Sequence, residues 1–201
     1  MPAAVLYELL RARRSIRRYA PQAVPSEMVE RLLSAAGWAP SSHNRQPWRF
    51  AIMTEPEVKA RLARAMGDRL EADRLADGDR PEAVAADTAR SFARITQAPV
   101  VVVVCLTLAE MDVYPDARRA GAERTMAVQS AAMAVQNLLL AAHAEGLGAC
   151  WMCAPLFCSD VVRDILNLPD DWQPQALITL GYPAEAREKT RHPLETSVLW
   201  R

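Results

Sequence analysis

Four arginines fall within six residues near the N-terminus, Arg13, Arg14, Arg17 and Arg18, and Ser15 lies between the two pairs. A guanidinium presents a planar fork of N–H donors that stays protonated, and the serine hydroxyl adds one more donor for an oxyanion. Cations this close repel one another unless an anion lies among them. The segment therefore indicates an anion site. The alternative is a solvated basic helix end, in which the cations only complement the helix dipole.

A polar loop at residues 40–46 offers a second set of binding groups. Pro40 and Pro47 bound it, and its donors and acceptors suit the edge of a heterocycle or a phosphate ester: Ser41, Ser42, His43, Asn44 and Gln46. Polar groups on a loop held by a rigid scaffold often bind ligands. The alternative is a plain connection into a strand, with His43 facing only solvent.

The stretch 146–153 combines small residues with a Cys-x-x-Cys pattern. Cys150 and Cys153 raise the question of zinc or thiol redox chemistry. On a strand, side chains three positions apart point to opposite faces, so these two sulfurs cannot chelate one ion, and we expect no metal. Gly148 and its small neighbours would instead let a flat ligand approach the backbone near Trp151.

A basic turn near the C-terminus contains Lys189, Arg191 and His192. Most such turns are only solvated. This turn would have a binding role if it reaches the same anion as the N-terminal arginines.

The elements that must position these groups follow from hydrophobic periodicity and from helix start and stop signals. Helices are expected over 3–13, from residue 25 onward, and over 57–70, 123–145 and 159–166; strands are expected over 50–54, 98–106, 147–153 and 175–182. The run 98–106 is β-branched without alternation, which predicts a central strand covered on both faces. Segment 71–90 holds many charges and the breakers Gly78 and Pro81, so we expect it to be exposed, and a lid over a cleft is one role open to it. The order of elements predicts an α+β or α/β fold, with a sheet covered by helices.

Length and composition limit the classes of function. A chain of 201 residues predicts a single domain, 1–201, and its 24 basic and 24 acidic residues cancel, which disfavours nucleic acid and anionic membranes as partners. The N-terminus lacks the pattern of a secretory signal, so we expect a cytoplasmic protein whose four cysteines are free thiols. The apolar stretch 126–144 contains several polar residues, which favours a core helix over a membrane span. Because that helix is apolar nearly all round, it needs cover on most sides, and we expect a homodimer.

Together, these motifs resemble the FMN-dependent nitroreductase family. The similar segments are RRSIRRYAPQAVP, APSSHNRQPWRF, AVQNLLLAAHAEGLGACWM, LNLPDDWQPQALITLGYP and KTRHPLE, in this order and across nearly the whole chain. The resemblance implies an α+β nitroreductase-like fold with a central mixed sheet covered by helices. It also implies an interlocked homodimer with two FMN molecules in the interface.

The resemblance further implies roles for individual residues. Arg13 and Ser15 would meet the FMN phosphate and ribityl end with Arg14 close by, and Lys189 and Arg191 would return to the phosphate. Arg17 would lie at the pyrimidine edge, where a cation stabilises the negative charge of reduced FMN. From the partner subunit would come Pro40, Ser41 and Ser42, together with Asn44 and Gln46. Backbone groups of Trp151, Met152 and Cys153 would face flavin N5 and O4, and Arg90 or Arg94 would add one contact.

The implied activity is a ping-pong transfer of hydride from NAD(P)H through FMN to a small organic acceptor, with no catalytic side chain required. The sequence contains no G-x-G-x-x-G, so no Rossmann site is expected for the nicotinamide. Some segments, such as LFCSDVVR and LPDDW, look like the nitroreductase-like C-terminal domain of the bifunctional ligase that makes the deazaflavin coenzyme F-420. Two alternatives follow: a reductase of a dehydro precursor of that coenzyme, and a non-catalytic carrier of flavin or deazaflavin.

Overall fold

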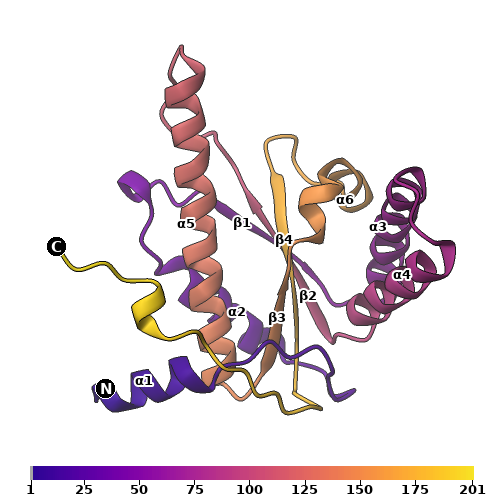
Figure 1. Cartoon of the computed structure of the whole chain (residues 1–201), viewed down its shortest axis with the longest axis horizontal. Helices are drawn as coiled ribbons and strands as arrows, with labels where there is room; N and C mark the ends of the chain where they lie inside the picture. Colours follow the sequence, from indigo (N-terminus) through magenta and orange to yellow (C-terminus); the bar gives the residue numbers. More distant parts are fainter. Residues whose placement is uncertain (1) are drawn as a thin grey trace.

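The computed structural model describes residues 2–201 as a four-stranded sheet with helices on both faces (Figure 1). The strand order is β1-β2-β4-β3. The elements are, in chain order, α1 (Ala3–Ala12), α2 (Ser26–Gly37), β1 (Trp48–Met53), α3 (Pro56–Ala76), α4 (Pro81–Thr96), β2 (Val100–Leu106), α5 (Ala117–Ala144), β3 (Gly148–Met152), α6 (Ser159–Leu166) and β4 (Gln173–Gly181). The expected α+β class is confirmed.

The sheet pairs differently from the expected mixed sheet. All three strand pairings are antiparallel, and the parallel pairing that the structure contains is a single bridge between Ser15 and Ala149. The parallel component therefore comes from the irregular segment that follows α1, and not from another strand.

The run of valines forms the centre of the sheet, as expected. Every residue of β2 is buried. Because side chains alternate along a strand, Val102 and Val104 pack into the cluster that includes α2 and α5, whereas Val101 and Val103 pack into the cluster under α3, α4 and α6. One uniformly apolar strand thus supports two hydrophobic layers.

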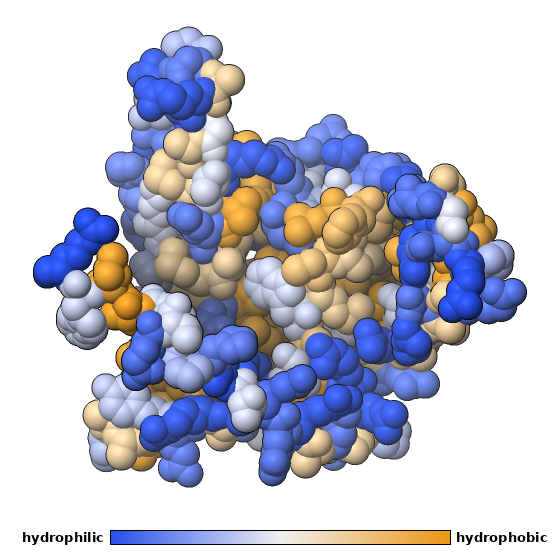
Figure 2. Space-filling model, viewed as in Figure 1, coloured by the Kyte–Doolittle hydropathy of each residue, from blue (hydrophilic) through white to orange (hydrophobic). Residues whose placement is uncertain are grey.

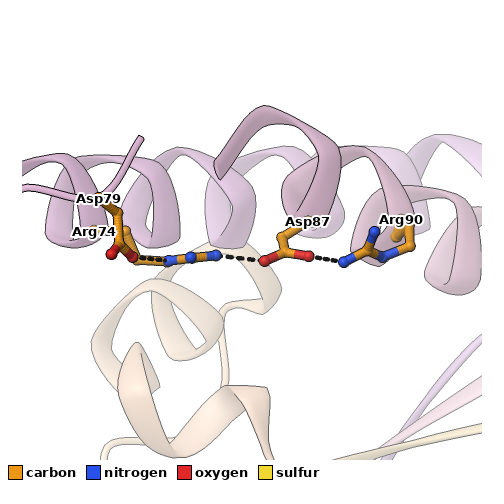
Figure 3. A network of polar contacts seen from close by, with 4 residues as sticks. All are labelled: Arg74, Asp79, Asp87 and Arg90. Carbon is orange, nitrogen blue, oxygen red and sulfur yellow. Dashed lines mark hydrogen bonds and ion pairs between the residues drawn. The ribbon is translucent and has the colours of Figure 1, made fainter. Parts of the chain in front are cut away.

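Segment 71–90 is mostly exposed, as expected, and it is helical on both sides of a short turn. Helix α3 continues to Ala76, α4 begins at Pro81, and only residues 77–80 connect them. Proline is well suited to the first helical position, and Gly78 adopts φ +86° in the turn, so the two breakers mark a tight helical hairpin. Arg74 pairs with Asp79 and Asp87, and Asp87 also pairs with Arg90, which ties the two helices together (Figure 3).

Helix α5 begins at Ala117, six residues before the expected start, because the Asp116 side chain caps it by accepting a 2.9 Å hydrogen bond from the Arg119 amide. Its expected burial on most sides is not observed in the single chain. Val128 and Met133 are each 39% exposed, and the first turns project beyond the sheet (Figure 1). Within residues 2–201, α5 is the one helix long and apolar enough to cross a membrane, yet 44% of its most apolar stretch is already buried in this fold.

Candidate functional site

The arginine segment lies along the outer edge of β3. The Ile16 amide donates a 3.0 Å hydrogen bond to the carbonyl of Ala149, and the Ile16 side chain is buried over Gly148. A Cβ at Gly148 would approach Ile16 to 2.8 Å, so a glycine is required for this close contact. Tyr19 fixes the end of the segment, because its hydroxyl lies 2.6 Å from the Ile16 carbonyl and 2.8 Å from Thr179 Oγ1.

The chain after β4 folds back over this segment. The Ala20 amide donates to Tyr182 and the Ala184 amide donates to Arg18. Glu185 then accepts a 2.7 Å hydrogen bond from the Arg17 amide and pairs with Arg187 at 2.8 Å. Burial alone would raise the pKa of Glu185, but the Arg17 amide and the Arg187 guanidinium hold that pKa below its ordinary value. Glu185 therefore stays ionised and joins the two basic segments.

The five residues predicted to bind the phosphate line one cavity of about 260 Å³, together with Arg17. Its walls are Arg13, Arg14, Ser15, Arg17, Arg187, Lys189 and Arg191. The structure thus brings together the N-terminal arginines and the C-terminal basic turn, and adds Arg187, which the sequence analysis missed. A signal existed, because residues 187, 189 and 191 are all basic, and alternate residues of an extended segment point to the same side.

The electrostatics of this arginine cavity call for an anion. The pKa of Arg13 is lowered by burial and by the neighbouring cations Arg191 and Arg14. Nε of Arg14 is buried and has no hydrogen-bond partner within residues 2–201. Among the residues that the structure describes, no carboxylate lines the cavity. A phosphate would satisfy the free donors and relieve the mutual repulsion, so the donor set fits the phosphate of a nucleotide cofactor.

The outer edge of β3 continues past the arginine segment. Because backbone groups alternate along a strand, the Trp151 N–H and C=O point to the same edge as those of Ala149. This edge can meet a flat ligand. Met152 packs into the cluster under α3 and α6. Cys150 is buried and Cys153 is exposed, with Cys153 Sγ accepting a 3.0 Å hydrogen bond from Trp151 Nε1. Among residues 2–201, no three His, Cys, Asp or Glu side chains gather closely enough to hold a metal ion.

Loop 40–46 has a strained backbone. His43, Asn44 and Gln46 have φ values of 48°, 56° and 49°, in the left-handed region that non-glycine residues seldom adopt. The Ser41 carbonyl accepts from the Asn44 amide, and Ser41 Oγ accepts from the Gln46 amide, each over 3.0 Å. Such strain persists only where other contacts enforce it, and it clusters at binding sites. Hydrophobic periodicity gives no information about backbone φ angles, so it could not have predicted the strain in this loop.

The loop and the arginine cavity do not meet within one chain. Loop residue Ser42 hydrogen-bonds to Ser130 and Met126 in the middle of α5. Arg13 and Arg14 instead line a neighbouring cavity together with His143 near the end of α5. Ser130 and His143 are thirteen positions apart, or about 20 Å of helix. The structure therefore separates Pro40, Ser41, Ser42, Asn44 and Gln46 from the other predicted site residues. The remaining candidates, Arg90 and Arg94, line a second basic cavity next to the first.

Known proteins are similar to this chain over most of its length. The family model described as "Nitroreductase family" matches residues 10–182. NADH dehydrogenase from Thermus thermophilus is 34% identical, over 94% of this chain and 92% of its own length. Iodotyrosine deiodinase from Haliscomenobacter hydrossis is 29% identical, over 91% of this chain and 81% of its own length. A solved structure from Desulfovibrio desulfuricans, described as a nitroreductase in complex with FMN, matches with a TM-score of 0.74 and 29% identity, over 98% of this chain and 96% of that one.

Proposed function

Because this chain belongs to the nitroreductase family, we propose that it is an FMN-dependent oxidoreductase that transfers a hydride from NAD(P)H to a small organic acceptor. The arginine cavity carries the proposal, since it gathers cations from both ends of the chain around a space that no carboxylate of residues 2–201 lines. FMN, when bound, supplies the hydride transfer between the two substrates. The protein supplies binding, orientation and electrostatics.

The cavity residues divide into two groups by role. We assign the FMN phosphate to Arg13, Arg14, Ser15, Lys189 and Arg191, because hydrogen bonds between charged partners are about twice as strong as neutral ones. Arg17 lines this cavity and the neighbouring one, so it lies where the two cavities meet. Its fixed positive charge would favour the reduced form of the cofactor. The outward backbone groups at Trp151 would orient the ring system along β3, with Met152 and Cys153 next to them.

We propose that a second copy of the chain completes the site. Loop 40–46 is held in a strained, binding-type conformation but lies well away from its own arginine cavity. A homodimer in which α5 meets its counterpart would place the loop of one subunit near the cavity of the other. The surface supports this arrangement: α1 has no buried residue in the single chain, and a helix of ten residues is marginal in water without packing.

The acceptor is the least constrained part of the proposal. Two relatives that are 34% and 29% identical to this chain are described as an NADH dehydrogenase and an iodotyrosine deiodinase, so family membership alone does not fix the acceptor. The similarity of LFCSDVVR and LPDDW to the coenzyme F-420 ligase domain favours a dehydro deazaflavin precursor as a second candidate. The third candidate, a carrier without turnover, would bind flavin but consume no NAD(P)H.

Steady-state oxidation of NADPH and NADH, with a quinone, a nitroaromatic and a dehydro deazaflavin precursor as acceptors, tests the proposal. Turnover with any of these supports a reductase and identifies the acceptor class. A fully FMN-loaded protein that oxidises neither nucleotide with any acceptor would contradict the reductase and favour the carrier.

A further inference from the structure

A cavity of about 290 Å³ lies between the second half of α3, Ser91 of α4 and η2 (Ala154–Phe157), the short 3-10 helix that follows β3. Its apolar walls are Met66, Leu70, Ala154, Phe157 and Cys158. None of the residues that line it also lines either basic cavity, so it is separate from the proposed cofactor site. Figure 2 shows hydrophobic residues at the surface beside α6 and α3, the helices labelled in Figure 1.

The apolar part of this cavity is suited to a small ring. Met66 and Cys158 are only 6% and 4% exposed and form its floor, whereas Phe157 is 78% exposed and lies at its mouth. A ligand that covers Phe157 would remove a large aromatic surface from water, which is favourable. A dry cavity of about 150 Å³ already holds benzene, so this larger one has room for an aromatic ring with a short chain.

Four charged side chains also line the cavity, and the two arginines among them are already neutralised. Arg69 pairs with Asp160 at 2.8 Å. Arg74 pairs with Asp79 at 2.6 Å and with Asp87 at 2.5 Å, and this network ties α3 to α4 (Figure 3). None of the three partner carboxylates lines the cavity. The arginines therefore leave little free positive charge for a ligand.

The other two charges of the cavity, Asp73 and Asp77, are not neutralised. Among residues 2–201, neither takes part in an ion pair. Asp73 lies in the last turn of α3 and Asp77 directly follows the helix. Two carboxylates four positions apart repel each other, and the carbonyl groups at a helix C-terminus carry partial negative charge that disfavours both. The free charge of the cavity is therefore negative, and a cation would relieve both kinds of repulsion.

Apolar and acidic groups follow one another along a single face of α3. Met66, Leu70, Asp73 and Asp77 are spaced by four, three and four positions, the spacing of neighbours on one side of a helix. A ligand that lies along this face would meet apolar groups at one end and carboxylates at the other. Small-molecule sites commonly combine mostly apolar walls with a few polar groups that fix the orientation of the ligand.

We propose that this cavity binds a small organic amine with an aromatic body. The ring lies over the apolar floor and against Phe157, and the ammonium group lies at the acidic end, beside Asp73 and Asp77. Phe157 contributes to both ends, because an aromatic face attracts a cation within about 6 Å as well as covering an apolar ring. The site is additional to the cofactor site, so this inference does not depend on the proposed function.

Calorimetric titration of the purified protein near neutral pH tests the class of ligand. The probes share one ring and chain and differ in charge: phenethylamine is a cation, 2-phenylethanol is neutral and 3-phenylpropionate is an anion. We expect phenethylamine to bind about tenfold more tightly than the alcohol, and the anion to bind more weakly than both, because the free charge of the cavity is negative. No saturable binding of phenethylamine, or equal affinities for the amine and the anion, would overturn the proposal.

Matched variants then locate the charge of the site. Replacing both acids, Asp73→Asn with Asp77→Asn, keeps the shape of the side chains and should weaken phenethylamine binding about tenfold. The control is Glu71→Gln, which removes an exposed acid of α3 that does not line this cavity. Equal phenethylamine affinity in the double variant and in the control would overturn the proposal.

A second pair of variants locates the ring. Phe157→Ala should weaken phenethylamine binding severalfold, whereas Leu156→Ala, at a neighbouring residue that is 54% exposed and does not line the cavity, should leave it unchanged. Equal affinities in these two variants would contradict the assignment of Phe157. We expect phenethylamine to leave the flavin content of the protein unchanged, and displacement of flavin would overturn the proposal by placing the amine in the cofactor site. Because no step of the titration requires turnover, failure of the proposed function would leave its result intact.

Discussion

The backbone amide of Arg17 donates a 2.7 Å hydrogen bond to Oε1 of Glu185, joining residues 168 positions apart in the sequence. Through this bond and the pair between Glu185 and Arg187, one carboxylate aligns the N-terminal arginines with the C-terminal basic turn. The negative charge of Glu185 thus helps to assemble the anion site.

Replacing this carboxylate by an amide, Glu185→Gln, should lower stability only near neutral pH. The lowered pKa of Glu185 means that its contribution is present above the ordinary value of 4.5 and is lost as the pH falls through the lowered pKa. The Glu185 side chain is 12% exposed and glutamine keeps one hydrogen-bond acceptor, so we expect a loss of about 1 kcal/mol in the free energy of unfolding. Denaturant unfolding at pH 7 and pH 3 measures it. A difference between wild type and variant that is the same at both pH values would contradict the prediction.

Removing a phosphate ligand should release FMN. Arg13→Ala and Arg191→Ala each delete a charged donor from the arginine cavity, and we expect each to weaken FMN binding by about 1–3 kcal/mol. The dissociation constant can be measured by flavin fluorescence. The control is Arg61→Ala, which removes an exposed arginine of α3 that does not line this cavity. Unchanged affinity in both cavity variants would exclude this cavity as the phosphate site.

Arg17→Gln should make bound FMN harder to reduce. The substitution keeps hydrogen-bonding capacity but removes the positive charge that favours the reduced cofactor. We expect the two-electron midpoint potential to fall by about 20–60 mV, equivalent to about 1–3 kcal/mol. Spectroelectrochemical titration measures the shift, and an unchanged potential would mean that another group faces the pyrimidine edge.

Tyr19→Phe should destabilise the fold by about 1–2 kcal/mol, because it leaves the buried Thr179 hydroxyl without its partner. Burial raises the pKa of Tyr19, so its neutral form stabilises the fold below the ordinary value of 10.0, and this contribution declines as the pH rises above it. Stability should therefore fall less steeply above pH 10 in the variant than in the wild type. The matched control is Tyr7→Phe, because Tyr7 is 57% exposed. Parallel stability–pH curves for the wild type and Tyr19→Phe would refute the stabilising role of the buried Tyr19 hydroxyl.

An acidic substitution on the exposed face of α5 should separate the subunits. Met133→Glu places a charge on a 39% exposed apolar position of the proposed interface, whereas Leu75→Glu does so at a 41% exposed position of α3, away from it. Sedimentation should give a dimer for Leu75→Glu, and a monomer with little FMN for Met133→Glu. A Met133→Glu monomer that keeps its full FMN content would show that one chain suffices for the site.

Prediction from the sequence succeeded where local physics decides the outcome. The unbroken valine run predicts β2 because only a doubly covered strand hides both its faces, and helix α6 begins and ends as expected. It failed at α4 because Gly78 and Pro81 are loop signals by composition, while their role as a helical turn depends on the pairs that Arg74 and Asp87 make across it. It could not say what covers α5, because an apolar helix looks the same whether it is covered by its own chain or by a partner.

For the site as well, local sequence patterns predict the separate segments but not how these segments meet. Residue types near Arg13 and Lys189 predicted two basic segments, but their shared cavity depends on the tail folding back through Glu185, which no local pattern encodes. The separation of loop 40–46 from that cavity likewise depends on where Ser42 meets α5.

The visible absorption spectrum of the purified protein, recorded before and after anaerobic addition of NADPH, tests the central claim most directly. An FMN-dependent oxidoreductase should show the flavin bands, and these should bleach when NADPH is added. A colourless protein that fails to take up added FMN would contradict the site, and a yellow protein that neither NADPH nor NADH bleaches would contradict the reductase.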